Sequence, residues 1–184
     1  MGAWTMDKKI VILSGSPRKD ATTDRLTAAF IRGAEDVGNK TICFRTADMK
    51  MGGCLGCGHC VRTRGVCVQK DDMTSILAAL READVLVLAS PVYYFGVTAQ
   101  LKLAIDRTYA LLDEDLPLRE AVLLITCGAA TEEAAAPSVA MFRKICQRMN
   151  LEEAGIVIAP GLHEPDEING RKELILAQQL GEKI

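Results

Sequence analysis

The chain has 184 residues, of which 49% are hydrophobic and 25% are charged. This size and composition are those of one globular domain and exclude an intrinsically disordered chain. The net charge is −2 and no block of lysine and arginine occurs, which argues against nucleic acid or an anionic membrane as a partner. No apolar run approaches the roughly 18 residues that a membrane span needs. We therefore expect a single domain over residues 1–184.

The amino terminus, MGAWTMDKKIVIL, lacks the basic segment before an apolar stretch that marks a secretory signal. Residues 1–5 are interpreted as an extension ahead of a native start at Met6. The seven cysteines are an odd number, and without a secretory signal they indicate a reducing compartment rather than a disulfide framework. We therefore expect a cytoplasmic protein.

Short apolar runs alternate with amphipathic patterns along the whole chain. The helical segments have apolar residues at three- and four-residue spacing. Strands are expected at residues 9–13, 41–44, 83–89, 121–126 and 155–159. Helices are expected around residues 26–34 and 73–80, and at residues 99–112, 132–149 and 173–183.

The predicted strands are apolar on both faces, as strands of a parallel sheet are when helices cover both sides. Five such units predict an α/β fold, a doubly wound three-layer sandwich. In this architecture ligands bind beyond the carboxyl ends of the strands, where the strand order switches. The loops at residues 15–23, 90–96 and 126–130 are therefore expected to converge on one crevice.

The first of these loops, GSPRKDATT at residues 15–23, connects a predicted strand to a predicted helix. A helix N-terminus binds anions through its free N–H groups and its dipole. Ser16, Thr22 and Thr23 add hydroxyl donors. Arg18 adds charge-assisted hydrogen bonds, so a monophosphate fits this set. Neither a Walker loop nor a Gly-x-Gly-x-x-Gly fingerprint is present. The alternative is that Thr22 or Thr23 only caps the helix.

The loop after the third predicted strand, SPVYYFG, places Tyr93, Tyr94 and Phe95 together in a chain with only 4% aromatic residues. Adjacent aromatic side chains at a ligand crevice can form a stacking wall for a flat heterocycle. The alternative is a hydrophobic staple or a subunit contact. After the fourth predicted strand, Gly128 lets the backbone approach a ligand closely.

Four cysteines lie in a glycine-rich segment that we expect to be a loop insertion at about residues 49–70. Cys54, Cys57, Cys60 and Cys67 have the spacing Cys-x2-Cys-x2-Cys-x6-Cys. Three closely spaced cysteines with a more distant fourth form an iron–sulfur pattern. Structural zinc more often uses two separated Cys-x2-Cys pairs. Three states stay open for this loop: a 4Fe–4S cluster, free or oxidised thiols, and zinc.

Other polar and sulfur-containing residues are given structural interpretations. Asp106 and Arg107, near the end of a predicted helix, are expected to form a helix-end salt bridge. His163 is expected to be a loop residue rather than a catalyst. Cys43 and Cys146 lie apart from the cysteine loop and are expected to be small buried hydrophobic residues.

The segments SGSPR at residues 14–18 and ASPVYYFGVTAQLKLAIDR at residues 89–107, with the cysteine loop, resemble the NADPH-dependent FMN reductase family. More narrowly, they resemble its iron–sulfur flavoprotein branch. The resemblance covers almost the whole chain. It implies a flavodoxin-like fold with strand order 2-1-3-4-5, non-covalently bound FMN, and a homodimer or homotetramer. The cysteine spacing matches that branch, which implies a 4Fe–4S cluster beside the flavin on the four loop cysteines.

The resemblance also implies roles for individual residues. The FMN phosphate is held by Ser16, Arg18, Thr22 and Thr23. The isoalloxazine is lined by Pro91, Val92, Tyr93, Tyr94 and Phe95. Gly96 opens the next helix, and Gly128 lies near the far edge of the ring. The first loop of the family usually continues Lys-Asn-Gly-Asn-Thr, whereas here Asp20 and Ala21 replace the amide and the glycine. We therefore expect a tighter loop with a lower affinity for phosphate.

This family implies an FMN-dependent oxidoreductase that passes electrons between NAD(P)H or ferredoxin and a small acceptor, such as a quinone or a flavin. The flavin supplies the chemistry, so no catalytic side chain is assigned. One alternative is a non-enzymatic electron carrier or thiol redox sensor. Another is a zinc-stabilised regulatory domain that binds a different phosphate-bearing ligand.

Overall fold

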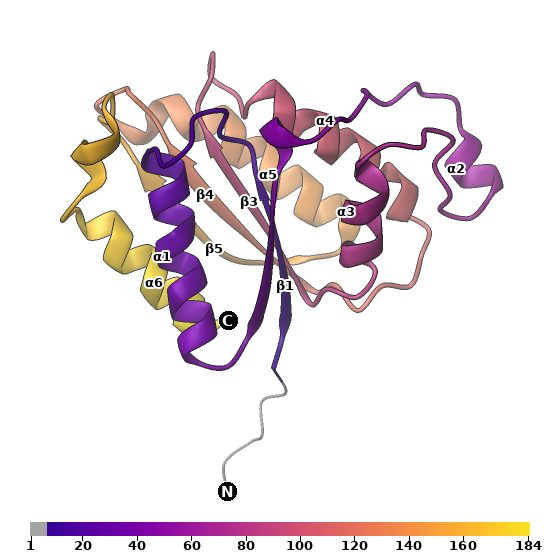
Figure 1. Ribbon diagram of the computed structural model, residues 1–184, viewed down its shortest axis with the longest axis horizontal. Helices are drawn as coiled ribbons and strands as arrows, with labels where there is room; N and C mark the ends of the chain where they lie inside the picture. Colours follow the sequence, from indigo (N-terminus) through magenta and orange to yellow (C-terminus); the bar gives the residue numbers. More distant parts are fainter. Residues whose placement is uncertain (1–6) are drawn as a thin grey trace, which may run out of the picture.

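The structure, a computed structural model, describes residues 7–184, and the predicted extension at residues 1–5 lies outside them. Five parallel strands form one sheet in the order β2-β1-β3-β4-β5, with helices on both faces (Figure 1). The strands are β1 (Lys9–Ser14), β2 (Lys40–Arg45), β3 (Val85–Pro91), β4 (Glu120–Thr126) and β5 (Glu152–Ala159). The predicted flavodoxin-like, doubly wound sandwich with strand order 2-1-3-4-5 is confirmed.

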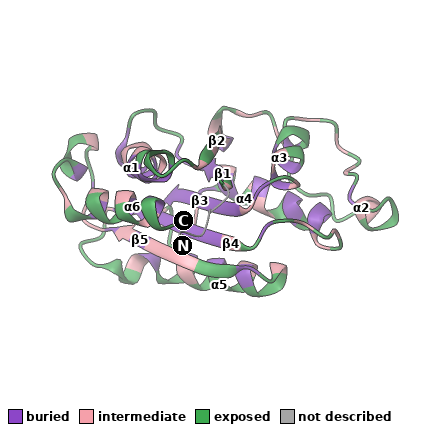
Figure 2. Cartoon of the chain, turned by 90° about the horizontal axis from the view of Figure 1, so that it is seen from below, coloured by how far each residue is buried: buried purple, intermediate pink, exposed green. Residues whose placement is uncertain are grey.

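Helices cover the sheet in two layers (Figure 2). One face carries α1 (Thr22–Asp36) and α6 (Lys172–Lys183), and the other carries α3 (Met73–Leu80), α4 (Ala99–Arg107) and α5 (Ala136–Met149). The short elements are α2 (His59–Arg62) in the cysteine loop and the 3₁₀ turns η1 (Thr46–Asp48), η2 (Thr108–Leu111), η3 (Glu132–Ala135) and η4 (Pro165–Ile168). The predicted helices at residues 99–112 and 132–149 are thus each an α-helix joined to a 3₁₀ turn. None of the described helices has the length and apolar character needed to cross a membrane.

Side chains of the central strands alternate between two hydrophobic cores. In β1, Ile10 and Ile12 face α1 and α6, whereas Val11 and Leu13 face α3, α4 and α5. Every residue of β3 is buried, and β4 is buried except at its first residue. A strand that is covered on both faces has no polar face to present, which explains the continuous apolar runs in the sequence.

The edge strand β2 departs from this pattern. Its Ile42 is 46% exposed, and Cys43 is also exposed. The prediction that this strand is apolar and buried on both faces is therefore wrong, as is the prediction that Cys43 is buried. Among residues 7–184 this strand pairs with β1 alone, so no described strand lies along its outer edge. In contrast, Cys146 of α5 is buried as predicted.

Helices α1 and α6 contact each other through two buried glycines. A β-carbon on Gly33 would stand 2.0 Å from the carbonyl oxygen of Gln178. A β-carbon on Gly181 would stand 2.2 Å from the carbonyl oxygen of Phe30. The two backbones therefore touch, and the contact has no room for a side chain at either position.

Replacing Gly33 by alanine tests this close contact. We expect Gly33→Ala to lower the free energy of unfolding by about 2 kcal/mol, because the added methyl group forces the helices apart and outweighs the helix propensity of alanine. Urea denaturation measures the change. Arg32→Ala, at an exposed position of the same helix, is the control and should change stability by no more than about 0.5 kcal/mol. A Gly33→Ala chain as stable as the parent would contradict the contact.

Candidate functional site

Three loops meet at the carboxyl edge of the sheet, where β1, β3 and β4 end. The Thr98 hydroxyl donates a 2.8 Å hydrogen bond to the Gly15 carbonyl, which joins the loop after β1 to the loop after β3. The Val92 amide donates to the Thr126 carbonyl at 2.8 Å, which joins the loop after β3 to the end of β4. The hydroxyl oxygens of Thr23 and Thr126 are 2.7 Å apart. The loops that the sequence predicts to converge are therefore in direct contact.

The loop after β1 leads into the N-terminus of α1. Thr22 and Thr23 are the first two residues of that helix, both are buried, and their hydroxyls reach Thr126. The N-cap is Ala21, and no side chain caps the helix there. The interpretation that a threonine merely caps the helix is therefore wrong. The uncapped first-turn N–H groups and the helix dipole together favour an anion at this position.

Ser16 and Arg18 shape the same loop in different ways. Ser16 is buried, and its hydroxyl donates to the Arg18 carbonyl at 2.9 Å. The Arg18 side chain is exposed, and its guanidinium donates to the His163 carbonyl at 3.4 Å. Asp20 has a positive φ of 54°, a conformation that aspartate tolerates better than most residues. The loop thus places one buried hydroxyl and one exposed cation beside the start of α1.

Arg45, the last residue of β2, braces this loop, although no local sequence pattern marks it. Its guanidinium donates to the Ser16 and Arg18 carbonyls, at 3.4 Å each, and pairs with Asp24 in the first turn of α1. Burial lowers the pKa of Arg45, but the Asp24 and Asp48 carboxylates raise it more. Because the pair neutralises Asp24, that carboxylate opposes an anion at the helix N-terminus less strongly. The sequence signal that could have identified Arg45 is its position, because it is a cationic residue at the end of the strand next to β1.

The three aromatic residues after β3 form a tight turn. Tyr93 and Gly96 exchange backbone hydrogen bonds of 2.9 and 3.1 Å. Between them, Tyr94 and Phe95 have φ values of 50° and 67°. Positive φ at both central residues is the signature of a type I′ turn, which normally holds Asn-Gly or a similar pair. Bulky aromatic residues are strained in this conformation.

The strained turn presents its side chains to solvent. Tyr94 is 98% exposed, Phe95 61% and Tyr93 44%. The rings of Tyr94 and Phe95 meet edge to face, with their centroids 6.0 Å apart. Below them, Pro91 is buried at the end of β3 and Val92 is half-buried. A strained backbone that holds exposed aromatic rings indicates a surface shaped for contact with a ligand or partner.

The two glycines predicted for the site, Gly96 and Gly128, lie in the loops after β3 and β4. Gly96 closes the aromatic turn and does not open the next helix, because α4 begins at Ala99 and has Thr98 as its N-cap. Gly128 follows β4 and lies against His163, since a β-carbon there would stand 3.0 Å from the imidazole Cε1. His163, which is exposed in the loop after β5, is thus a neighbour of the loop after β4.

The cysteine loop leaves the sheet at the same edge and projects beyond α3 and α4 (Figure 1). The Thr46 hydroxyl fixes its start by donating to the Ser14 carbonyl at the end of β1, at 3.1 Å. The ends of the loop, residues 50–53 and 69–72, then lie together and form what we call the neck. Its hydrogen bonds run from the Lys50 amide to Asp72 (2.7 Å), from the Gly52 amide to Asp71 (3.0 Å) and from the Gln69 side chain to the Gly53 carbonyl (3.0 Å).

The four cysteines of the loop line one cavity of about 430 Å³. Cys54 and Cys57 are exposed, and Cys60 and Cys67 are half-buried. Apolar side chains, including that of Tyr109, form much of its wall. Among residues 7–184, no three side chains of Cys, His, Asp or Glu meet as the ligands of a single metal ion do. The four cysteines therefore share the wall of one cavity without forming a single-metal site among the described residues.

The residues interpreted as a helix-end salt bridge have other partners. Asp106 pairs with Lys102 at 2.6 Å, one turn earlier in α4. Arg107 pairs with Asp71 of the neck at 2.7 Å, across 36 residues of sequence. The expected pairing of Asp106 with Arg107 is therefore wrong, and Arg107 is part of the support of the cysteine loop.

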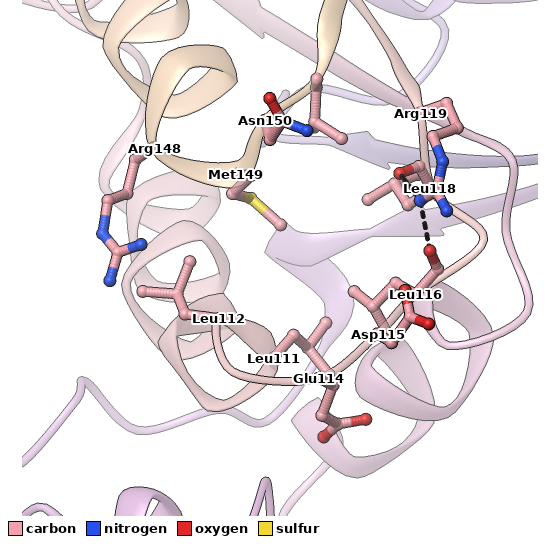
Figure 3. A pocket seen from close by; sticks show the side chains of 11 residues that line it. Leu111, Leu112, Glu114, Asp115, Leu116, Leu118, Arg119, Arg148, Met149 and Asn150 are labelled. Atoms are coloured by element: carbon pink, nitrogen blue, oxygen red, sulfur yellow. Dashed lines mark hydrogen bonds between the residues drawn. The ribbon is translucent and has the colours of Figure 1, made fainter.

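Another cavity, of about 250 Å³, lies at the opposite end of the sheet (Figure 3). Its lining includes Arg119 and Leu151, which directly precede the starts of β4 and β5, and Arg119 donates to the Leu116 carbonyl. Ligands of doubly wound sheets bind at the carboxyl ends of the strands. The cavity in Figure 3 is therefore not part of the candidate site.

Comparison with known protein families and curated proteins gives a consistent picture. The family model described as NADPH-dependent FMN reductase matches residues 8–159. An iron-sulfur flavoprotein of Archaeoglobus fulgidus is 40% identical over 99 residues, which cover 54% of this chain and 44% of that protein. An iron-sulfur flavoprotein of Methanocaldococcus jannaschii is 38% identical over 103 residues, which cover 56% of this chain and 53% of that protein. The chain spans about half the length of the curated relatives it matches.

Solved structures share the fold at low sequence identity. An NAD(P)H:quinone oxidoreductase from Methanothermobacter marburgensis has a TM-score of 0.74 and 16% identity, and the match covers 97% of each chain. An FMN-dependent NADH-azoreductase from Bacillus anthracis str. Ames Ancestor, in complex with FMN, has a TM-score of 0.65 and 16% identity, over 95% of this chain and 96% of that chain. At this identity the likeness concerns the fold.

Relieving the strained aromatic turn tests whether it costs stability. We expect the double substitution Tyr94→Asn with Phe95→Gly to raise the free energy of unfolding by about 1–2 kcal/mol, because Asn-Gly adopts the type I′ conformation readily. Urea denaturation measures the gain. The control is Tyr109→Asn, which removes a half-exposed aromatic ring outside the turn and should give no gain. A turn variant less stable than the parent would show that the turn is not strained.

Proposed function

Because the chain belongs to the NADPH-dependent FMN reductase family, we propose that it is an oxidoreductase that passes electrons between NAD(P)H or ferredoxin and a small acceptor, such as a quinone or a flavin. Membership confirms the resemblance predicted from the two site loops and the cysteine segment. One observation carries the proposal: the uncapped N-terminus of α1 and the exposed aromatic turn lie at the same carboxyl edge of the sheet, where the loops that hold them bond to each other.

In this proposal the two sides of the crevice hold the two ends of FMN. The phosphate is bound by the first-turn N–H groups of α1 and by Ser16, Arg18, Thr22 and Thr23. The isoalloxazine is lined by Pro91, Val92, Tyr93, Tyr94 and Phe95, with Gly96 closing the turn and Gly128 near the far edge of the ring. Bound flavin supplies the electron and hydride transfer, so no side chain is assigned a catalytic role.

We further propose that Cys54, Cys57, Cys60 and Cys67 hold a 4Fe–4S cluster. The shared cavity of the four thiols and the iron-sulfur flavoproteins among the relatives support this assignment. Such a cluster supplies one-electron transfer. The resemblance also supports a homodimer or homotetramer in the cytoplasm.

The first experiment is the visible spectrum of anaerobically purified protein, with iron, sulfide and zinc assayed on the same sample. Flavin bands with about four irons per chain are expected for a four-cysteine cluster site. Flavin bands without iron would contradict the cluster and indicate that the loop carries free or oxidised thiols. Stoichiometric zinc would instead indicate a single-metal site in the loop. A colourless protein that does not bind added FMN would contradict the proposed function.

Turnover distinguishes the enzyme from an electron carrier or a thiol sensor. With NAD(P)H or reduced ferredoxin as donor and an excess of quinone or FMN as acceptor, we expect steady consumption of the donor. Oxidation that stops after one equivalent with every donor would contradict an enzymatic role.

Removing the Arg18 side chain tests the phosphate site. We expect Arg18→Ala to raise the dissociation constant of FMN about 10- to 100-fold, because a charge-assisted hydrogen bond contributes about 1.5–3 kcal/mol. Fluorescence titration of the iron-free protein with FMN measures the constant. Lys19→Ala removes a neighbouring cation that faces Asp48 instead, at 3.7 Å, and should have a smaller effect. An unchanged constant in Arg18→Ala would refute the role of Arg18.

Replacing one loop cysteine tests the cluster ligands. We expect Cys57→Ala to abolish the iron–sulfur absorbance while FMN stays bound, because the loop lies outside the phosphate and ring contacts. Iron content and the flavin spectrum measure both parts. Cys43→Ala, an exposed cysteine of β2 outside the loop, is the control and should keep the full iron content. Unchanged iron in Cys57→Ala would refute this ligand.

A further inference from the structure

Arg107, the last residue of α4, holds the neck of the cysteine loop together. Its guanidinium donates to both carboxylate oxygens of Asp71, at 2.7 and 2.9 Å, and to the Gly52 carbonyl at 2.9 Å. Gly52 lies two residues before Cys54, and Asp71 lies four residues after Cys67. One side chain therefore ties both ends of the loop to a helix of the core.

The guanidinium of Arg107 has an N–H group that these hydrogen bonds do not use. The residue is 2% exposed, and its Nε has no hydrogen-bond partner among the described residues. A buried N–H of a charged group is costly to leave unpaired. Asp106, which precedes Arg107, and Tyr109, two residues after it, both line the cavity of the four cysteines. The hydrogen bond that Arg107 donates to Asp71 is the main cause of its raised pKa.

We propose that Arg107 positions the ends of the cysteine loop and sets the reduction potential of the cluster, by fixing a buried positive charge at the neck, next to the cavity that the four cysteines line. This inference rests on the proposed cluster. Hydrogen bonds to sulfur and nearby positive charge favour the reduced, more negative form of a cluster. Since a guanidinium does not lose its proton in proteins, the charge is permanent.

Arg81 provides a matched control on the other side of the loop. It donates to both oxygens of Glu114, at 2.8 and 2.7 Å, and to the Gly65 carbonyl at 3.1 Å, so its bonds repeat those of Arg107. It is half-buried rather than fully buried. The hydrogen bonding of Arg81 to the Glu114 carboxylate is the main cause of its raised pKa. Arg81 thus supports the loop with the same kind of contact, but it lies outside the neck and is less buried than Arg107.

The test compares Arg107→Gln, Arg81→Gln and Asp71→Asn in anaerobically purified holoprotein. Redox titration followed by electron paramagnetic resonance gives the cluster potential, and the visible spectrum gives the flavin potential. For Arg107→Gln we expect about a tenfold lower ratio of reduced to oxidised cluster at a fixed potential, a fall of about 59 mV for a one-electron couple. For Asp71→Asn we expect a rise, because the substitution removes the carboxylate that neutralises the guanidinium. Arg81→Gln and the flavin potential should not change.

The opposite changes in cluster potential distinguish electrostatic control from a structural role. Loosening the neck would change the potential in the same direction in Arg107→Gln and in Asp71→Asn. An unchanged cluster potential in Arg107→Gln, an equal fall in Arg81→Gln, or a fall in Asp71→Asn would each overturn the inference. If Arg107→Gln holds no cluster, the cluster potential of Asp71→Asn provides the test. A cluster potential that does not rise in Asp71→Asn would then overturn the inference.

A parent protein without iron would contradict the proposed cluster and with it the effect on potential. Amide hydrogen exchange then tests the positioning role on the iron-free chain. The Gly52 and Asp72 amides bond within the neck, and we expect them to exchange at least tenfold faster in Arg107→Gln than in Arg81→Gln. Equal exchange in the two variants would overturn the positioning role as well.

Discussion

The parallel direction of all five strands decides where the functional groups of this chain can lie. Because β1, β3 and β4 run the same way, the loops that follow them emerge at one edge and bond to one another there. The strand order also switches at β1, so α1 and α4 leave that edge toward opposite faces of the sheet. The N-terminus of α1 and the aromatic turn that precedes α4 therefore meet at the edge of the sheet where ligands of doubly wound folds bind.

The same edge gathers the features that cost the fold stability. Two aromatic residues occupy a turn that suits Asn-Gly, and the Nε of the buried Arg107 has no partner within residues 7–184. Stability comes from elsewhere: from the two cores that alternate through β1, β3 and β4, and from the close contact of α1 with α6. This separation allows a strained site, since strained residues persist where the surrounding structure over-determines them.

The sequence predicts the features that local pattern controls. Buried strands such as β3 are continuous apolar runs, and the position of a loop after such a strand is enough to assign it to the site. The bracing residues escape prediction because their partners are distant in sequence: Arg45 bonds to Ser16, and Arg107 bonds to Asp71 across 36 residues. The burial of the edge strand β2 was predicted wrongly, because an apolar run does not reveal how many neighbouring strands a strand has. Similarly, the positive φ values of Tyr94 and Phe95 could not be predicted, because tyrosine and phenylalanine disfavour that conformation.

Helix α4 connects the two halves of the proposed site. At its N-terminus, Thr98 bonds to Gly15 of the loop after β1, and a β-carbon on that glycine would clash with Leu101 at 2.6 Å. At its C-terminus, Arg107 bonds to the neck of the cysteine loop. A helix of nine residues is about 14 Å long and is held by its own backbone hydrogen bonds. The rigid helix α4 therefore sets the distance between the loop after β1 and the neck, although both of these segments are loops. A flavin and a cluster held at the two ends would keep a constant distance, which is what repeated electron transfer between two fixed groups requires.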